Sequence, residues 1–283
     1  MIERNDSPGI SAVVITKNEE TNIQRCLESL KWADETVVVD SGSTDRTLEI
    51  AERCGARALT HIMSPFNANQ QRNWAMENGN LIGEWVLFMD ADEQVTPALA
   101  EAICRELGQA QDDVVGYRLA PKFMFMGRWL KHAGGYPAWH DRLVRKGTLS
   151  FVGSWPPDHF EQTDKKIGHI YEPYLHFSFN NGIERWIDKH NLYSTNVACD
   201  VISSLQSDYH VEGRHEFGER LQLWASRYII LGTLLRLAYF LIVRRAVFDG
   251  HAGIVHALMM AMYQLMIGLK VEEFKRRERG SPM

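Results

Sequence analysis

The stretch Asp90-Ala91-Asp92-Glu93 places three carboxylates within four residues, directly after the apolar run Trp85–Met89. Like charges this close repel one another, so such a cluster belongs at a solvated turn or around a cation. A hard cation such as Mg²⁺ or Mn²⁺ is commonly held by one or two carboxylates together with substrate phosphates. Along an extended segment, residues two apart point to the same side, which would aim Asp90 and Asp92 at one ligand. The spacing therefore predicts a divalent-cation site, with a solvated turn as the alternative.

Two further polar clusters follow apolar, β-branched runs. Thr16-Lys17-Asn18-Glu19 ends the run that begins at Ser11, and Asp40-Ser41-Gly42-Ser43 follows Thr36–Val39. Apolar strands without alternation, separated by helices, predict a parallel sheet that is covered on both faces. Ligands of such sheets bind beyond the carboxyl ends of the strands. We therefore expect the three clusters to converge on one crevice.

The elements that must position these clusters are visible in the hydrophobic periodicity. The expected strands are 11–16, 36–39, 57–60, 84–89 and 114–119, and the expected helices are 20–32, 45–54, 68–78, 97–107 and 182–197, with Thr96 as a helix N-cap. Pro121–Asn180 is irregular and typical of recognition loops, and Cys199–Gly218 reads as a polar linker. The pattern predicts an α/β catalytic domain over residues 1–215 and a helical C-terminal region over residues 216–283.

Composition excludes several classes of protein. The net charge of −5 gives no reason to expect a nucleic-acid partner, and four widely spaced cysteines without a C-x-x-C pair argue against a zinc site or a disulfide framework. The first residues contain no apolar stretch typical of a secretory signal. No G-x-G-x-x-G follows the first strand, and no P-loop motif occurs anywhere, so dinucleotide and P-loop sites are poor interpretations.

Two other residues have a chemical interpretation beside a structural one. Asp40 follows an apolar strand directly, where a carboxylate could accept a hydrogen bond from a base or a ribose, or merely shape a turn. Arg72 and Asn73, in the segment 69-NQQRNWA-75, could reach a phosphate or lie on a solvated helix face.

Taken in order, these segments resemble family 2 glycosyltransferases of the GT-A fold. The resemblance is carried by 13-VVITKNEETNIQRCLESL-30, 37-VVVDSGSTDRTLEIA-51, 69-NQQRNWA-75 and 84-EWVLFMDADE-93, and it covers about the first 120 residues. Within the family, the chain looks most like the lipopolysaccharide-core glucosyltransferase branch. The segments 136-YPAWHDRLVRKG-147, 173-PYLHFSF-179, 189-KHNLYST-195 and 248-FDGHAGIVHALMMAMYQ-264 extend that resemblance more loosely.

The resemblance implies a nucleotide-sugar donor, often UDP-linked, a divalent cation (Mn²⁺ or Mg²⁺) and inversion at the anomeric carbon by direct displacement. The resemblance also implies a role for individual residues of the site. Thr16, Asn18 and Glu19 would line the nucleotide pocket, Asp40 would contact the base, Arg72 would lie near the nucleotide, Asp90 near the ribose, and Asp92, with Asp90 beside it, at the metal.

An inverting transfer also needs a general base for the acceptor hydroxyl. Relatives in the branch tend to show His-Glu after a glycine-rich loop, whereas this chain reads 156-PPDHFE-161, which makes Asp158, His159 and Glu161 the candidates, with Asp158 or His159 favoured. Arg142 and Arg145 are weaker candidates for contacts with the diphosphate or an anionic acceptor.

The C-terminal region has two apolar segments, Leu221–Val243 and Ala252–Leu269, and a basic end. From Glu219 to Met283 the chain carries ten Lys/Arg and five Asp/Glu, a net +5, against 21 and 31, a net −10, in the remaining 218 residues. A transmembrane hairpin would place Arg236 near the midplane and Arg244-Arg245 on the far side, both unfavourable. We expect in-plane attachment to an anionic membrane surface, on the cytosolic side of a bacterial inner membrane, with a soluble helix pair or a homo-oligomer interface as the alternative.

The sequence thus predicts a metal-dependent, inverting glycosyltransferase that acts on a cell-envelope acceptor such as lipopolysaccharide core or a lipid-linked glycan. Two alternatives stay open. A sugar-nucleotide pyrophosphorylase shares the sheet type but would carry a glycine-rich, basic loop after the first strand, which TKNEETN is not. A non-catalytic membrane scaffold with a degenerate domain is the other.

Overall fold

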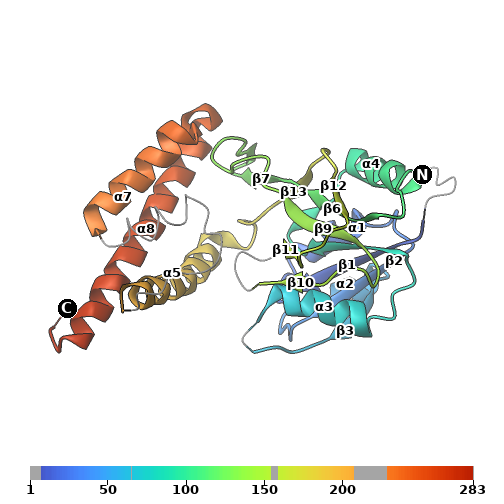
Figure 1. The fold of residues 1–283 in the computed structure, drawn as a ribbon, viewed down its shortest axis with the longest axis horizontal. Coiled ribbons are helices and arrows are strands. Elements are labelled where there is room, and N and C mark those ends of the chain that lie inside the picture. Colours follow the sequence, from blue (N-terminus) through green and yellow to red (C-terminus); the bar gives the residue numbers. More distant parts are fainter. Residues whose placement is uncertain (1–7, 65, 154–158, 207–227, 283) are drawn as a thin grey trace. The chain divides into compact units, whose positions relative to one another are not determined.

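The structure is a computed structural model that describes residues 8–64, 66–153, 159–206 and 228–282 (Figure 1). Contacts between Cα atoms divide the chain into two units. The N-terminal unit comprises Met1–Met124 and Tyr136–Asn181, and the C-terminal unit comprises Phe125–Gly135 and Gly182–Met283. The predicted domain boundary at residues 215 and 216 lies outside the described residues.

A seven-stranded sheet forms the centre of the N-terminal unit, in the order β12-β6-β9-β4-β1-β2-β3. Its strands are β1 (Ile10–Thr16), β2 (Glu35–Asp40), β3 (Arg57–Thr60), β4 (Trp85–Asp90), β6 (Val114–Leu119), β9 (His140–Arg145) and β12 (Lys166–His169). β4, β1, β2 and β3 run parallel, whereas β9 lies antiparallel between β4 and β6. The expected α/β architecture with a mostly parallel sheet is confirmed, and the reversed strand is the addition that the sequence did not predict.

Both faces of this sheet are covered, which explains why its strands lack alternation. Val14 faces a core built with α1 (Ile23–Glu28), α2 (Thr47–Arg53) and α4 (Pro97–Gly108). Its neighbour Val13 faces a second core that includes Ala75 of α3 (Ala68–Asn78) and Phe151. β1, β2 and β4 therefore contribute apolar side chains to two cores at once, and their polar residues lie at or next to their ends.

Helix starts follow local side-chain chemistry. Asn67 accepts a hydrogen bond from the N–H of Gln70 at the start of α3, and Thr96 accepts one from the N–H of Leu99 at the start of α4, where Pro97 occupies the first turn. The prediction of Thr96 as an N-cap is confirmed, and so are the predicted helices over residues 68–78 and 97–107.

The segment predicted to be irregular contains several short strands. Besides β9 and β12 these are β7 (Pro121–Phe125), β10 (Phe151–Val152), β11 (His159–Phe160) and β13 (Tyr174–His176). β13 lies between β7 and β5 (Glu93–Gln94) in a second, small sheet, and β10 pairs with β11. β5 thereby brings the segment after Asp92 next to a strand more than 80 residues later in the chain.

The C-terminal unit is mainly helical (Figure 1). Its elements are β8 (Arg128–Trp129), α5 (Gly182–Gln206), α7 (Ile229–Ala238), the π-helical turn η1 (Tyr239–Val243), the 3-10 turn η2 (Ala246–Asp249) and α8 (Gly250–Glu278). α5 runs on to Gln206, so the predicted linker is wrong over residues 199–206. By length and composition alone, Ala246–Glu278 is apolar enough to cross a membrane, a test that the core helix of a soluble protein also passes.

Helix α8 packs against both α5 and α7. Lys270 Nζ donates to the carbonyl and side-chain oxygens of Asn191, to Ser194 Oγ at 2.9 Å and to Thr195 Oγ1 at 2.7 Å, which joins α8 to α5. Gly268 lies against Ile229, where an added Cβ would come within 3.2 Å of the Ile229 Cα atom. Within the described residues, the predicted apolar segment Leu221–Val243 is helical from Ile229 to Val243, and Arg245, with a left-handed φ of 55°, separates it from the 3-10 turn that follows.

Candidate functional site

The three polar clusters meet at one edge of the sheet. In the register of the parallel strands, Thr16 at the end of β1 pairs with Asp40 at the end of β2, and Ile15 pairs with Asp90 at the end of β4. Because β4, β1 and β2 are neighbours, their carboxyl ends form a continuous rim. The expected convergence is therefore present.

Asp40 shapes the loop that follows its own strand. It is fully buried, and its Oδ2 accepts hydrogen bonds of 2.8 Å from the N–H groups of Gly42 and Ser43. Asn18 joins this loop to the end of β1: its N–H donates to Ser43 Oγ, and its Oδ1 accepts from the N–H of Thr44, both at 2.8 Å. Asn18 does so with a φ of 56°, a conformation that asparagine tolerates better than most residues. The two loops form one bonded rim.

Two buried hydroxyls at this rim lack hydrogen-bond partners, the Oγ1 of Thr16 and the Oγ of Ser41. A buried polar group without a partner is costly, and such groups are often completed by a ligand. Glu19, in contrast, accepts 2.8 Å bonds from the amides of Asn22 and Asn181, and so holds the start of α1 to the turn that ends the N-terminal unit. Its predicted place in a nucleotide pocket stays a prediction.

Asp90 is held between two buried arginines. Arg72 Nη2 donates to its Oδ1 at 2.9 Å, and Arg142 Nη2 to its Oδ2 at 3.1 Å. Burial alone would raise the pKa of Asp90, but the charges of Arg142 and Arg72 outweigh it and hold the pKa well below its usual range. Asp90 is therefore ionised, and both of its oxygens are bonded to guanidinium groups.

Glu93 is the third carboxylate of the cluster, and no separate role was predicted for it. It is fully buried, accepts a 2.7 Å bond from Arg142, and accepts a 2.8 Å bond from the N–H of Asp90. Burial, opposed by Arg142 and aided by Asp90, raises its pKa to about 7. Glu93 folds the chain back onto Asp90 and so shapes the turn that presents Asp92.

Asp92 points to a different partner from Asp90. The chain turns at Ala91-Asp92 instead of continuing as a strand, so the expectation of one extended segment is wrong. Asp92 Oδ2 lies 3.3 Å from Nε2 of His176 on β13. Burial lowers the pKa of His176, but the charge of Asp92 outweighs it and raises the pKa. His176 lies in the segment that extended the family resemblance, although its role was not predicted.

Asp92 and His176 are the residues that could hold a cation here. Within the described residues, no group of three or more acidic, histidine or cysteine side chains is arranged as a metal site. A carboxylate oxygen and an imidazole nitrogen nevertheless suit a cation that takes its remaining ligands from phosphates and water. Asp90 fits that task less well, because two arginines already use its oxygens.

Helix α3 holds the β10-β11 hairpin beside this cluster. Asn69 Nδ2 donates to the carbonyl groups of Val152 and Gly153, at 2.8 and 3.0 Å. Asn73 accepts from the N–H of Phe151 and donates to its carbonyl group, at 2.8 and 2.9 Å. The expectation that Asn73 reaches a phosphate is therefore replaced by a structural role.

Two of the three candidate bases, His159 and Glu161, lie on or directly after strand β11. Asp158 lies outside the described residues. His159 is exposed on β11, opposite Val152. Glu161 is also exposed, and its Oε1 accepts a 3.1 Å bond from the N–H of Ser150.

Arg142 and Arg145 have separate places on β9. Arg142 belongs to the carboxylate cluster, whereas Arg145 pairs in register with Trp85, at the amino end of β4. There its guanidinium contacts Glu84 at 3.4 Å and lies 5.2 Å from the centre of the Trp85 ring. The structure does not bring Arg145 to the rim, and we leave it out of the site.

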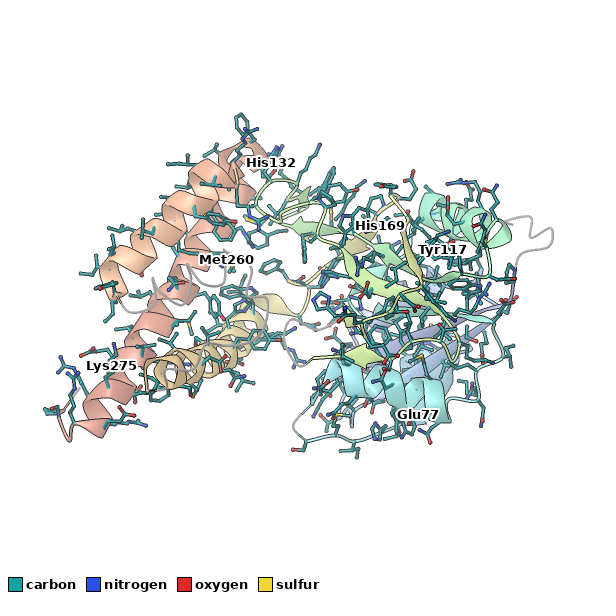
Figure 2. All side chains as sticks on the ribbon, in the orientation of Figure 1. Glu77, Tyr117, His132, His169, Met260 and Lys275 are labelled. Atoms are coloured by element: carbon teal, nitrogen blue, oxygen red, sulfur yellow. The ribbon has the colours of Figure 1, made fainter. Side chains whose placement is uncertain are left out.

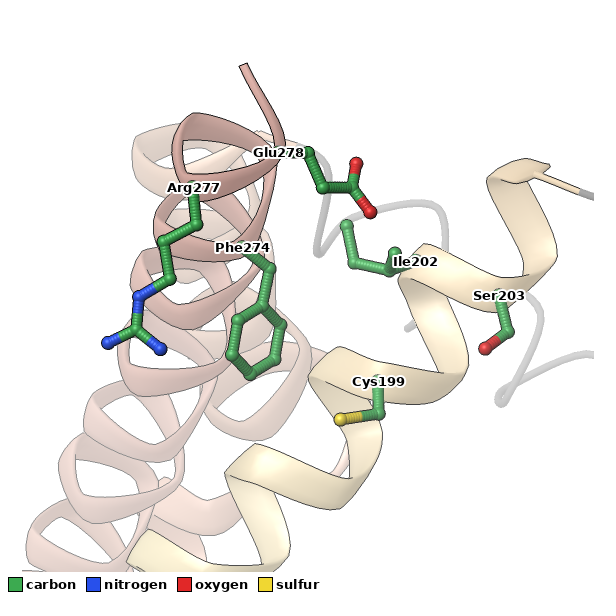
Figure 3. Close-up of a pocket in the computed structure, with 6 residues that line it drawn as sticks. All are labelled: Cys199, Ile202, Ser203, Phe274, Arg277 and Glu278. Atoms are coloured by element: carbon green, nitrogen blue, oxygen red, sulfur yellow. The ribbon is translucent and has the colours of Figure 1, made fainter. Parts of the chain in front are cut away.

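A hollow of about 350 Å³ lies in the C-terminal unit (Figure 3). It is lined by Cys199, Ile202, Ser203, Phe274, Arg277 and Glu278. Its lining is mostly apolar, and none of the predicted site residues contributes to it.

With this geometry established, similarity to known proteins is informative. The family model of Glycosyl transferase family 2 matches residues 11–169. An uncharacterized glycosyltransferase of Rickettsia conorii is 33% identical over 205 residues, spanning 68% of this chain and 70% of the relative. The lipopolysaccharide core biosynthesis glycosyltransferase LpsC of Rhizobium meliloti is 32% identical over 141 residues, 49% of this chain and 51% of LpsC. Among solved structures, a mannosyltransferase from Pyrobaculum calidifontis in complex with GDP-Man and Mn²⁺ is 16% identical, with 97% of this chain and 90% of that chain covered and a TM-score of 0.48.

Proposed function

The chain belongs to glycosyl transferase family 2, and we propose that it is an inverting enzyme that transfers a sugar from a UDP-sugar to a cell-envelope acceptor. The observation that carries this proposal is the rim on which Thr16, Asp40 and Asp90 end three neighbouring parallel strands. The proposed acceptor is a lipopolysaccharide core or a lipid-linked glycan, in keeping with the name of LpsC.

We assign the donor nucleotide to the loops after β1 and β2. The hydroxyl groups of Thr16 and Ser41, which have no hydrogen-bond partner, could bond to the nucleotide. The hydrogen bonds of Asn18 and Asp40 hold the two loops together before the donor binds. Asp90, kept ionised by Arg72 and Arg142, would accept hydrogen bonds from ribose hydroxyls through its remaining lone pairs. A rigid rim of this kind avoids the entropic penalty of ordering loops on binding.

We assign the donor diphosphate to the neighbourhood of Asp92 and His176, two residues that would hold a Mn²⁺ or Mg²⁺ ion. The ion supplies positive charge that stabilises the departing nucleotide diphosphate. Asp92 and His176 come from segments that the pairing of β5 with β13 joins, so the pair is fixed by the small sheet. Metal binding by His176 requires its neutral form, and Asp92 favours the protonated form, so the cation and a proton compete at this nitrogen.

We assign the general base to Asp158 or His159. A base must reach the acceptor hydroxyl, and an exposed hairpin beside α3 is accessible to an incoming acceptor. Asn69 and Asn73 would fix that hairpin relative to Arg72 on the same helix.

We propose that the C-terminal unit attaches the enzyme in the plane of an anionic membrane, at the cytosolic side of a bacterial inner membrane. Support comes from exposed apolar side chains on α7, including Ile230, Leu231 and Leu234, and from the apolar composition of Ala246–Glu278. A membrane-bound acceptor would then meet a soluble donor at the surface.

Donor binding can be tested with the full chain by thermal shift, with UDP-sugars, with and without Mn²⁺, in parallel with Asp92→Ala. A ligand that binds only the native state raises the melting temperature. We expect stabilisation that requires both UDP-sugar and Mn²⁺ and disappears in Asp92→Ala. Slow metal-dependent release of UDP from the donor would support a transferase, whereas formation of UTP and a sugar phosphate after pyrophosphate is added would favour a pyrophosphorylase. Stabilisation that is equal without metal or in Asp92→Ala would contradict the metal assignment.

A further inference from the structure

Two segments far apart in the sequence join in the C-terminal unit. Asp249 accepts hydrogen bonds from the N–H groups of His132 at 3.0 Å and Ala133 at 2.7 Å, and its Oδ1 lies 2.8 Å from His132 Nδ1. His132 is labelled in Figure 2. The ring of His132 also lies 5.8 Å from the ring of Phe248. The loop of residues 126–132 and the turn of residues 242–248 therefore form one surface, which we call the basic tip.

The basic tip exposes large apolar side chains. Ile242 is 74% exposed, Val243 67%, Phe248 72% and Met126 58%. Single exposed apolar residues are ordinary, whereas a group of them usually marks an interaction site. Helix α7 leads into the same turn and exposes Ile230 and Leu234, which are four residues apart and so lie on one face.

Four cations accompany these side chains. Arg128, Lys131, Arg244 and Arg245 are all exposed. Asp249, directly after the turn, is the one acid in or next to the two segments, and its carboxylate is buried in the bonds to His132 and Ala133.

The basic end of α8 differs from the basic tip in this respect. There Arg276 pairs with Glu272 at 2.8 Å, and Arg277 pairs with Glu273 at 2.5 Å. Acids close by thus offset much of that charge, whereas the two segments of the basic tip carry four cations and have only the buried Asp249 beside them.

We propose that the basic tip binds an anionic phospholipid bilayer. The apolar side chains enter the boundary between headgroups and acyl chains, and the four cations contact lipid phosphates and anionic headgroups. Repulsion between like charges argues against a dimer formed through the basic tip, because two facing tips would bring two sets of cations together. This inference rests on the proposed membrane attachment, and it names the contacting surface and the lipid class.

Co-sedimentation of the full chain with vesicles tests the proposal. Vesicles of phosphatidylcholine alone are compared with vesicles that contain about one third phosphatidylglycerol. We expect binding that requires the anionic lipid and weakens as salt is added, because salt screens exposed charges.

Paired substitutions locate the surface. Arg128→Gln with Lys131→Gln, and Arg244→Gln with Arg245→Gln, each remove two charges from the tip, while Arg276→Gln with Arg277→Gln removes two from the end of α8. We expect each tip pair to lower the partition coefficient roughly thirtyfold, at about 1 kcal/mol per charge, and the α8 pair to change it about twofold or less. Phe248→Ser should weaken binding while every charge is retained.

The proposal is overturned if the α8 pair weakens binding as much as the tip pairs, or if neutral vesicles bind equally well. It is also overturned if the chain does not co-sediment with either kind of vesicle and instead forms dimers, and if the Phe248→Ser variant is monomeric. Stabilisation by UDP-sugar and Mn²⁺, measured without vesicles, should be the same in all tip variants. If UDP-sugar and Mn²⁺ do not stabilise the unmodified chain, the proposed function is contradicted. The result of the vesicle experiment is not affected by that outcome.

Discussion

Arg142 donates a 2.7 Å hydrogen bond to Glu93, and both side chains are buried. The same guanidinium donates to Asp90, so one cation from the antiparallel strand β9 holds the carboxylate that ends β4 and the carboxylate that begins β5. Burying charges is unfavourable unless they are paired and hydrogen-bonded. The rim that presents Asp92 therefore depends on this network for its shape.

Arg142→Met should destabilise the protein strongly, because Glu93 would remain buried without its cation. Removing one partner of a buried ion pair typically costs about 3–5 kcal/mol of unfolding free energy. Arg145→Met is the matched control on the same strand, since its partner Glu84 is exposed, and exposed pairs contribute about 0–1 kcal/mol. Denaturant unfolding of both variants makes the comparison, and equal losses would refute a special role for the Arg142 network.

Asp92→Ala should remove transfer activity while the fold persists. The lost carboxylate is assigned to the cation and its diphosphate, and loss of one electrostatic contact to a transition state lowers the rate at least about 100-fold. Asp112→Ala, which removes a fully exposed carboxylate, should transfer at the normal rate. Sugar transfer and melting temperature are measured together, and near-normal transfer by Asp92→Ala would end the metal assignment.

The strand ends were predictable because they depend on local composition. Runs such as Val37–Val39 can be buried only inside a covered sheet, and the polar residues that follow must lie at its edge. The N-cap at Thr96 was predictable for a similar reason, since its side chain bonds to a group only three residues away. Local chemistry therefore located Thr16, Asp40 and Asp90 on the rim.

The partners of the site residues were not predictable in the same way. His176 is 84 residues from Asp92 and reaches it only through the pairing of β5 with β13. Nothing local reveals that β9 runs antiparallel, and its direction decides that Arg142, and not Arg145, lies beside the carboxylates. Asn73 looked like a phosphate ligand because its hydrogen-bond partner, the backbone of Phe151, is 78 residues away.

The identity of the base can be settled by three single substitutions. Asp158→Asn or His159→Gln should lower kcat by about 10²–10⁴, the usual contribution of a general base, with donor binding unchanged. Glu161→Gln should keep most of the activity, because its carboxylate is used by the N–H of Ser150. The pH–rate profile of each variant serves as the check: the fall in rate on the acid side, where the base becomes protonated, should disappear only in the variant that lacks the base. A kcat loss confined to Glu161→Gln would reverse our assignment.

His256 on α8 is a buried histidine held without charge. Its ring lies 5.6 Å from the Phe240 ring, and its Nδ1 has no hydrogen-bond partner. Burial, aided by the nearby His190 and Arg236 and opposed by Asp249, lowers the pKa of His256 to about 4. The unfolded chain therefore binds a proton at this residue at a higher pH than the native protein does.

His256→Gln should flatten the acid side of the stability profile. A depressed pKa contributes stability that is complete above the unfolded value of 6.5 and is lost as the pH falls toward about 4. At about 1.4 kcal/mol per pH unit, the unmodified chain should lose about 3 kcal/mol over that interval through this residue alone.

Other groups also titrate between pH 6.5 and 4, so the quantity to measure is the difference in unfolding free energy between the His256→Gln variant and the unmodified chain, from denaturant unfolding at each pH. That difference should shrink by about 3 kcal/mol between pH 6.5 and 4, whereas His251→Gln, at an exposed position on the same helix, should follow the unmodified chain. A constant difference for His256→Gln across this range would mean that His256 is protonated as easily in the native protein as in the unfolded one.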